Sequence, residues 1–320
     1  MMRLFLLITF MVLLSAACRM PAEDSKVQKT IIVASLKGPS SMGLIHFIDS
    51  ISKVENATVD IKILDEPLQV RKMMLDGTAD FALLPTTMAA ILYNKGLEYR
   101  LMAIPVWGTL YLFGSDTTIK TWEDLKNKRI HVMAKGMTPD ILLRYLLVKY
   151  GLDPEKDVNL DYSFPTHIDL ANAVASGIAE LGVISEPLVS LAISKNKKSD
   201  IIFDLNTEWY NIEGVPLAQT AIMVKADLLS KRPGLAEEII NAFGRSIRWV
   251  NSYPDSAAVL IVKYNILPTE EIAAGAITRS HIELKRAEEV RTEIEEYLRV
   301  FYTMSPDIIG GKMPDENFIY

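Results

Sequence analysis

A short pattern, Lys-Gly-x-Ser/Thr, occurs twice in this chain, each time between an apolar segment that predicts a strand and a segment that predicts a helix. The two copies are Lys37-Gly38-Pro39-Ser40 and Lys135-Gly136-Met137-Thr138. The first turn of a helix presents unpaired backbone N–H groups and a partial positive charge, and a glycine before it lets a ligand approach the backbone. Such a turn at the carboxyl end of a strand is the usual binding place of open α/β sheets. The pattern therefore predicts ligand contacts at Gly38, Pro39, Ser40, Ser41, Gly136 and Thr138.

An ordinary capped helix explains each copy equally well when that copy is taken alone. A second repeat changes this balance, because residues 77–84 (GTADFALL) match residues 177–184 (GIAELGVI). The first pair of segments is 98 residues apart and the second pair is 100 residues apart. Two matches in the same order at nearly one spacing predict two lobes of similar design that face each other across a cleft. Lys37 and Lys135 are not predicted as ligands, since a lysine that follows a strand is usually solvated.

The other repeated strands also end in polar or aromatic residues that the same geometry places at the cleft. Thr86 and Thr87 follow one of them and Glu186 follows the other. Glu186 either meets a ligand amine or serves as a carboxylate at a helix start. Trp107 and Tyr111 lie near the expected crossover between the lobes, where they either stack on a flat ligand or pack as core and hinge residues.

These residues are positioned by strands that alternate with helices, which predicts an α/β fold with a parallel or mixed sheet in each lobe. Strands are expected at residues 29–36, 58–64, 81–84, 101–106, 109–113, 129–133, 158–162, 181–184, 201–205 and 219–225. Helices are expected at residues 43–51, 67–75, 88–93, 139–149 and 168–175, and over most of the chain from 226 to 302.

The N-terminus has the features of an export signal. Arg3 precedes an unbroken apolar stretch, residues 4–14, and small residues then lead to Cys18, the one cysteine of the chain. The stretch is shorter than the roughly 20 residues that span a bilayer. Cys18 lies where a bacterial lipoprotein carries its modified cysteine, although Ser15 replaces the more usual Leu. We therefore expect a signal peptide over residues 1–17, lipidation of Cys18 and a polar tether over residues 18–27.

Composition and missing motifs narrow the function. The net charge is -6 and no long basic run occurs, which argues against nucleic acid as a partner. The four histidines are scattered without metal-ligand spacing, and a lone cysteine excludes a thiolate metal site. Leu44 stands where a P-loop requires lysine, and there is no G-x-S-x-G elbow. We expect no catalytic constellation, no metal and no cofactor.

The segment from Ile31 to about Ala226 resembles the periplasmic binding proteins of the nitrate/sulfonate/taurine and thiamine-pyrimidine type, which are the substrate-binding subunits of ABC importers. The resemblance rests on residues 36–43 (LKGPSSMG), 75–80 (LDGTAD), 122–126 (WEDLK) and 135–139 (KGMTP). It implies a type II binding fold with one lobe over residues 28–113 plus 217–320 and the other over residues 114–216. The two hinge crossovers would lie near Phe113-Gly114-Ser115 and Gly214-Val215-Pro216.

The resemblance also implies a membrane permease and an ATPase as partners and a hinge motion that closes the lobes on the solute. The expected function is that of an exported, membrane-anchored lipoprotein, facing the periplasm or the cell exterior, that binds a small sulfonate- or pyrimidine-like molecule. Because one fold hosts many functions, an enzyme on this scaffold and a ligand-sensing surface lipoprotein remain the alternatives. The helix starts favour an anionic group, whereas Glu186 and the aromatic residues favour a flat amine.

Overall fold

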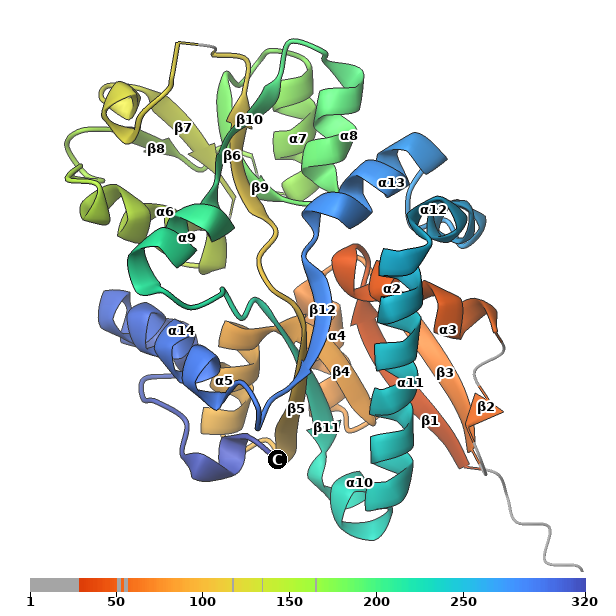
Figure 1. Ribbon diagram of the computed structural model, residues 1–320. Helices are drawn as coiled ribbons and strands as arrows, with labels where there is room; N and C mark the ends of the chain where they lie inside the picture. The colour runs from red at the N-terminus through yellow and green to blue at the C-terminus, as the bar shows by residue number, and fades with distance from the viewer. Residues whose placement is uncertain (1–28, 51–52, 55–56, 117, 134, 165) are drawn as a thin grey trace, which may run out of the picture.

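The computed structural model describes residues 29–320, apart from residues 51–52, 55–56, 117, 134 and 165. The expected signal peptide, the tether and Cys18 lie outside the described residues. Within these residues the strands form two sheets, and helices cover both, so the α/β prediction is confirmed. Figure 1 shows the two sheets in separate lobes, one above the other. We call the lobe with the seven-stranded sheet the first lobe and the lobe with the five-stranded sheet the second lobe.

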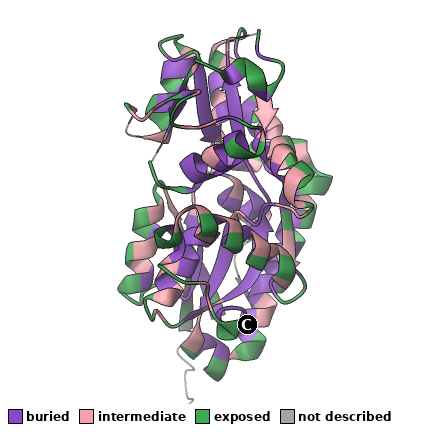
Figure 2. Cartoon of the chain, turned by 90° about the vertical axis from the view of Figure 1, so that its left-hand side faces the viewer, coloured by how far each residue is buried: buried purple, intermediate pink, exposed green. Residues whose placement is uncertain are grey.

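The first sheet runs in the order β12 (Ile282–Arg286), β5 (Tyr99–Val106), β11 (Thr220–Lys225), β4 (Phe81–Pro85), β1 (Lys29–Leu36), β3 (Ala57–Leu64) and β2 (Lys53–Val54). The second sheet runs in the order β10 (Asp200–Asp204), β6 (Leu110–Gly114), β9 (Leu181–Ser185), β7 (Arg129–Val132) and β8 (Asn159–Asp161). Burial on both faces explains the nearly continuous apolar sequences of the central strands. Figure 2 shows the central strands of both lobes largely as buried.

The two sheets share one topology. In the first lobe β1 pairs in parallel with β3 and β4, and β11 lies antiparallel to β4 and β5. In the second lobe β7 pairs in parallel with β8 and β9, and β6 lies antiparallel to β9 and β10. The helices before the repeated strands also correspond, because α4 spans Pro67–Leu75 and α7 spans His167–Ala175. The prediction of two lobes of similar design is confirmed at the level of strand order and direction.

Helices pack on both faces of each sheet. The first lobe carries α2 (Pro39–Gly43), α3 (Ile45–Asp49), α4, α5 (Thr86–Asn94), α10 (Ala226–Lys231), α11 (Pro233–Ser252), α12 (Pro254–Lys263), α13 (Glu270–Arg279), α14 (Arg291–Met304) and the short 3-10 helices η2 (Pro306–Ile309) and η3 (Glu316–Phe318). The second lobe carries η1 (Trp122–Leu125), α6 (Thr138–Lys149), α7, α8 (Leu188–Lys195) and α9 (Leu205–Glu213).

One apolar cluster runs through both lobes. It joins the α4, α5 and α14 side of the first sheet to α6 and α9 of the second lobe. The contact between the lobes contains an aromatic group in which Trp209 of α9 packs against Tyr145 of α6 and against Tyr297 and Phe301 of α14. Trp209, Tyr297 and Phe301 are all 0% exposed, so the two lobes share buried side chains as well as two covalent crossovers.

The first crossover differs in position from the prediction. Residues 109–113 were assigned to the first lobe, but β6 pairs with β9 and β10 in the second sheet. The chain therefore changes sheet at residues 107–109, between β5 and β6, rather than near Phe113. Both strands are apolar, so their sequences carry no sign of which sheet they join. The second change of sheet, between the end of α9 at Glu213 and β11, includes the predicted segment at Gly214.

Candidate ligand site between the lobes

The two repeated loops begin helices of different length. Gly38 precedes α2, a helix of five residues, so Ser40 and Ser41 lie inside that helix and do not cap it. Thr138 is the first residue of α6, a helix of 12 residues, and is not its cap. Both glycines have a positive φ, +124° at Gly38 and +76° at Gly136, which explains why glycine occurs in both copies.

Both glycine N–H groups are already used within their own loops. The Gly38 N–H donates to Ser41 Oγ at 3.0 Å, and the Gly136 N–H donates to Asp140 Oδ2 at 2.7 Å. These two N–H groups are therefore engaged within the loops, and ligand contact at Gly38 and Gly136 stays a prediction that rests on close approach to their backbone. Their role is to shape the loop before each helix start.

Asp140 anchors the second loop through a buried network. It is 2% exposed and accepts hydrogen bonds from Arg144 Nε at 2.7 Å and from the Tyr162 hydroxyl at 2.6 Å. Burial by itself lowers the pKa of Arg144. Its hydrogen bonds with Tyr162, Glu155 and Asp140 together raise the pKa by more than burial lowers it, so the pKa of Arg144 lies above its ordinary value. Asp140 therefore ties the loop at Gly136 to Arg144 of α6 and to Tyr162.

The predicted threonines meet across the lobes. Thr87 Oγ1 of α5 lies 3.1 Å from Thr138 Oγ1 of α6, and both side chains are buried. Thr86 is 0% exposed, and its Oγ1 is enclosed without a hydrogen-bond partner among the described residues. The first turns of α5 and α6, one from each lobe, therefore meet through the Thr87 and Thr138 hydroxyls, and Thr86 lies beside Thr87 at the start of α5.

Tyr297 of α14 adds a further buried hydroxyl near Thr138 that the sequence did not reveal. Burial raises its pKa, and the nearby Thr138 side chain opposes that rise. Tyr297 lies more than a hundred residues beyond the repeats, in a helix whose apolar spacing predicts only core packing. The sequence offered no signal that would have assigned it to the site.

The first repeated loop also contacts the second lobe. A Cβ atom built on Gly38 would lie 3.2 Å from Pro187 Cδ, which follows Glu186. Ser40 is 6% exposed and Ser41 is 0% exposed, and the Ser41 hydroxyl donates back to the Gly38 carbonyl at 3.1 Å. Gly38 is thus placed at the contact between the lobes, while the buried Ser41 hydroxyl is occupied by its own loop.

Glu186, for which the sequence allowed either contact with a ligand amine or a role at a helix start, is paired inside the protein. Its side chain is 0% exposed and accepts from Arg279 Nε at 2.6 Å. It also accepts from the Ser190 N–H at 3.1 Å and from the Ser190 hydroxyl at 2.8 Å. The alternative reading, a carboxylate at a helix start, agrees with the bond to Ser190 in the first turn of α8.

Trp107 and Tyr111 are packing residues of the crossover rather than exposed stacking surfaces. Trp107 is 4% exposed, and its indole N–H donates to the Glu283 carbonyl at 2.8 Å. Tyr111 is 2% exposed, and its hydroxyl donates to the Arg279 carbonyl at 2.6 Å. Of the two possibilities that the sequence allowed, stacking on a flat ligand and core packing at the hinge, the structure favours core packing.

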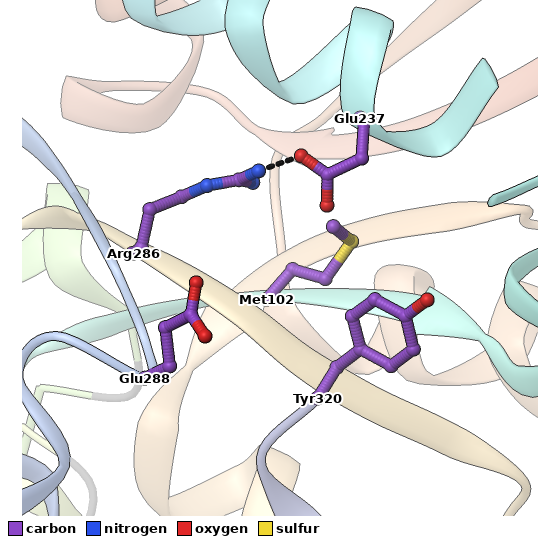
Figure 3. A pocket seen from close by; sticks show the side chains of 5 residues that line it. All are labelled: Met102, Glu237, Arg286, Glu288 and Tyr320. Carbon is purple, nitrogen blue, oxygen red and sulfur yellow. Dashed lines mark ion pairs between the residues drawn. The ribbon is translucent and has the colours of Figure 1, made fainter. Parts of the chain in front are cut away.

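Two surface hollows lie away from this contact. The first, of about 220 Å³, is on the first lobe and is lined by Met102, Glu237, Arg286, Glu288 and Tyr320. Figure 3 shows Arg286 directed at Glu237 within it, with Glu288 and Tyr320 along its sides. The second lies between α14 and the C-terminal residues. Carboxylates line both, so neither resembles an anion site.

Metal-ligand clusters and membrane-spanning helices are both absent from the part of the chain that the structure describes. No group of three or more His, Cys, Asp or Glu residues there is arranged to hold a metal ion. Among the same residues, no helix is both long and apolar enough to cross a membrane.

Two lobes of matching topology, joined by crossing strands and facing each other with helix starts, define the fold of periplasmic binding proteins. The family model described as "ABC transporter, phosphonate, periplasmic substrate-binding protein" matches residues 43–245. The chain belongs to this family. Membership implies an exported protein with a small-molecule ligand and with a permease and an ATPase as partners.

Individual relatives agree with this class. The protein YtlA of Bacillus subtilis, named as a binding protein, is 24% identical over 257 residues, which cover 76% of this chain and 72% of YtlA. The crystal structure of an ABC transporter from Parabacteroides distasonis has 29% identity and a TM-score of 0.80 and covers 91% of this chain and 98% of its own. The aliphatic sulphonate binding protein SsuA of Escherichia coli has the same fold, with 16% identity, a TM-score of 0.73 and coverage of 89% and 92%.

Proposed function

We propose that this protein is the lipid-anchored solute-binding component of an ABC import system and that it captures a small organic anion of the sulfonate type between its lobes. The observation that carries the ligand class is the group of buried hydroxyls at the contact between the lobes. Thr86, Thr87 and Thr138 lie at the starts of α5 and α6, and Tyr297 lies beside Thr138.

Neutral donors at helix starts suit the oxygens of an anion. Hydroxyl groups and the first N–H groups of a helix donate hydrogen bonds, and the helix end contributes a partial positive charge. A pyrimidine amine would need an acceptor, and the predicted acceptor, Glu186, is engaged by Arg279 and Ser190. This balance favours a sulfonate or a phosphonate over a flat amine. Similar structures of sulfonate-binding proteins and the phosphonate description of the family agree with that preference.

Calorimetric titration tests the ligand class. The chain with Cys18→Ser is titrated with ethanesulfonate, taurine, methylphosphonate and an aminopyrimidine, and unchanged ligand is checked by mass spectrometry afterwards. We expect heat of binding with at least one sulfonate or phosphonate and none with the aminopyrimidine. Binding of the aminopyrimidine alone contradicts the anion proposal, and turnover of any compound favours an enzyme on this fold.

The lipid anchor has a separate test. In a bacterial host, the wild-type chain is expected in the membrane fraction, with an intact mass that fits cleavage before Cys18 and addition of acyl chains. The Cys18→Ser chain is expected to lose both the added mass and the membrane association. A wild-type protein that is found unmodified and free of membranes contradicts the anchor.

A further inference from the structure

Helix α13 connects the two lobes by non-covalent contacts, in addition to the two covalent crossovers. Its apolar residues Ile272, Ala273, Ala276 and Ile277 belong to a buried cluster of the first lobe, together with α3, α11 and α12. Its last residue, Arg279, instead contacts residues of the second lobe, and α13 packs against α8 of that lobe (Figure 1). The helix is therefore rooted in one lobe and ends on the other.

Arg279 is held at both its side chain and its backbone. Its Nε donates to Glu186 Oε1 at 2.6 Å, and its Nη2 donates to the Ser190 hydroxyl at 2.5 Å. Its carbonyl accepts from the Tyr111 hydroxyl at 2.6 Å. Glu186 follows β9, Ser190 lies in α8 and Tyr111 lies in β6, so all three partners are in the second lobe.

The segment after Arg279 follows the first crossover. The Trp107 N–H donates to the His281 carbonyl at 3.1 Å, and His281 Nδ1 lies 2.8 Å from the Gly108 carbonyl oxygen. His281 has a φ of +43°, a conformation that only the surrounding contacts stabilise in a residue other than glycine. Residues 279–281 thus line the point at which the chain passes from one sheet to the other.

We infer that Arg279 is a positioning residue that latches the two lobes together and thereby sets the balance between open and closed forms. Every donor and acceptor in the latch belongs to the chain, so the contact works without a bound solute. When the lobes separate at α8 and α13, the Arg279–Glu186 pair must break. A charge-assisted bond to a carboxylate that is 0% exposed is among the stronger contacts available for this purpose. The inference does not depend on which solute the protein binds.

The latch predicts that its loss opens the lobes. Spin labels at Leu68→Cys and Ile168→Cys, in a Cys18→Ser background, report the distance between the exposed first turns of α4 and α7. We expect Arg279→Met to shift the distance distribution of the solute-free protein toward longer values. Arg279→Lys keeps the charge but reaches fewer partners, so an intermediate distribution is expected. Arg299→Met, which removes an exposed pair with Glu296 on α14, is the matched control and leaves the distribution unchanged.

A double substitution separates latching from general destabilisation. If Arg279 acts through Glu186, then Arg279→Met in a Glu186→Gln background adds little to the distance shift that Glu186→Gln produces alone. The Kd for ethanesulfonate, measured on the same variants, is expected to rise about tenfold on loss of the latch, because closure would then draw on ligand binding energy. An unchanged distance in Arg279→Met, or an equal shift in both backgrounds, overturns the inference. The distance measurement needs no ligand, so its outcome is independent of the proposed solute class.

Discussion

Thr87 and Thr138 are separated by 51 residues in sequence, yet their Oγ1 atoms lie 3.1 Å apart and join the first turns of two helices from different lobes. This contact brings together residues of both repeats that pattern alone had singled out. These are two of the hydroxyl groups that we propose as contacts of the solute.

Removal of one of these hydroxyls gives the first prediction. Thr138→Val keeps the shape of the side chain but removes the hydrogen bond to Thr87 and a donor for an anion. We expect unfolding free energy to fall by about 1 kcal/mol, while the Kd for ethanesulfonate rises tenfold or more, since a buried acceptor would be left without its donor. Chemical denaturation and calorimetry measure the two effects. Thr303→Val, which removes an exposed hydroxyl that donates to the Arg299 carbonyl on α14, is expected to change neither.

The second prediction concerns the glycine at the first loop. Gly38→Ala must adopt a φ of +124° and places a Cβ atom 3.2 Å from Pro187 Cδ. We expect a loss of about 1–3 kcal/mol in unfolding free energy and weaker solute binding, because the new atom presses on the second lobe.

Gly136→Ala is the comparison for that variant. A Cβ atom there has nothing within 4 Å, although its φ is also positive at +76°. We expect a loss of about 1 kcal/mol from backbone strain alone and an unchanged inter-lobe distance. Equal effects of the two substitutions on that distance would contradict the Gly38–Pro187 contact.

The third prediction tests the anchor of the second loop. Asp140→Asn removes the carboxylate that lies 2.7 Å from Arg144 Nε and leaves the Arg144 guanidinium, whose side chain is 14% exposed, with the exposed Glu155 as its carboxylate partner. Breaking a largely buried ion pair from one side is strongly unfavourable, so we expect a loss of about 2–4 kcal/mol by chemical denaturation. Asp227→Asn removes the exposed i,i+4 pair with Lys231 and is expected to cost less than about 1 kcal/mol. If Asp140→Asn loses no more unfolding free energy than Asp227→Asn, the buried network does not stabilise the second loop.

The fourth prediction is a pH dependence. Burial lowers the pKa of His167, the first residue of α7, to about 4. Its unfolded value is near 6.5, so between these values the unfolded state binds more protons and folding weakens as the pH falls. The loss of unfolding free energy that His167 causes approaches about 3 kcal/mol at the acid end of this window.

The measurement compares variants over that pH range. His167→Gln is expected to flatten the fall in unfolding free energy between about pH 6.5 and pH 4 relative to wild type. His46→Gln, a change in α3 of the first lobe, is the control and is expected to keep the wild-type slope. The same slope in wild type and in His167→Gln would show that the fall arises elsewhere, for example at paired carboxylates.

Local patterns predicted most of the architecture. Strand β1 was expected at residues 29–36 and helix α4 at residues 67–75, and both have those bounds. Apolar runs between glycines mark such elements because burial on both faces and helix termination are local requirements. The duplicated segments revealed the matched lobes because equal topology demands similar turns at equal spacing.

The site was only partly predictable, because its polar groups find partners far away in the sequence. Glu186 forms an ion pair with Arg279, which is 93 residues further along the chain, and no local sequence pattern predicts such a pair. Tyr297 lies in a helix with an amphipathic sequence that is equally typical of ordinary packing. The sheet to which β6 belongs was missed for the same reason, since pairing partners are chosen by the whole fold.

The placement of β11 between β4 and β5 has a consequence for the order in which the molecule assembles. All strands of the second sheet are encoded before residue 205, whereas the strand that separates β4 from β5 begins at Thr220. During synthesis from the N-terminus, all strands of the second sheet are present before β11, the strand that lies between β4 and β5 of the first sheet, has been made. The lobe whose synthesis begins first is therefore the one whose sheet receives its last strands latest along the chain.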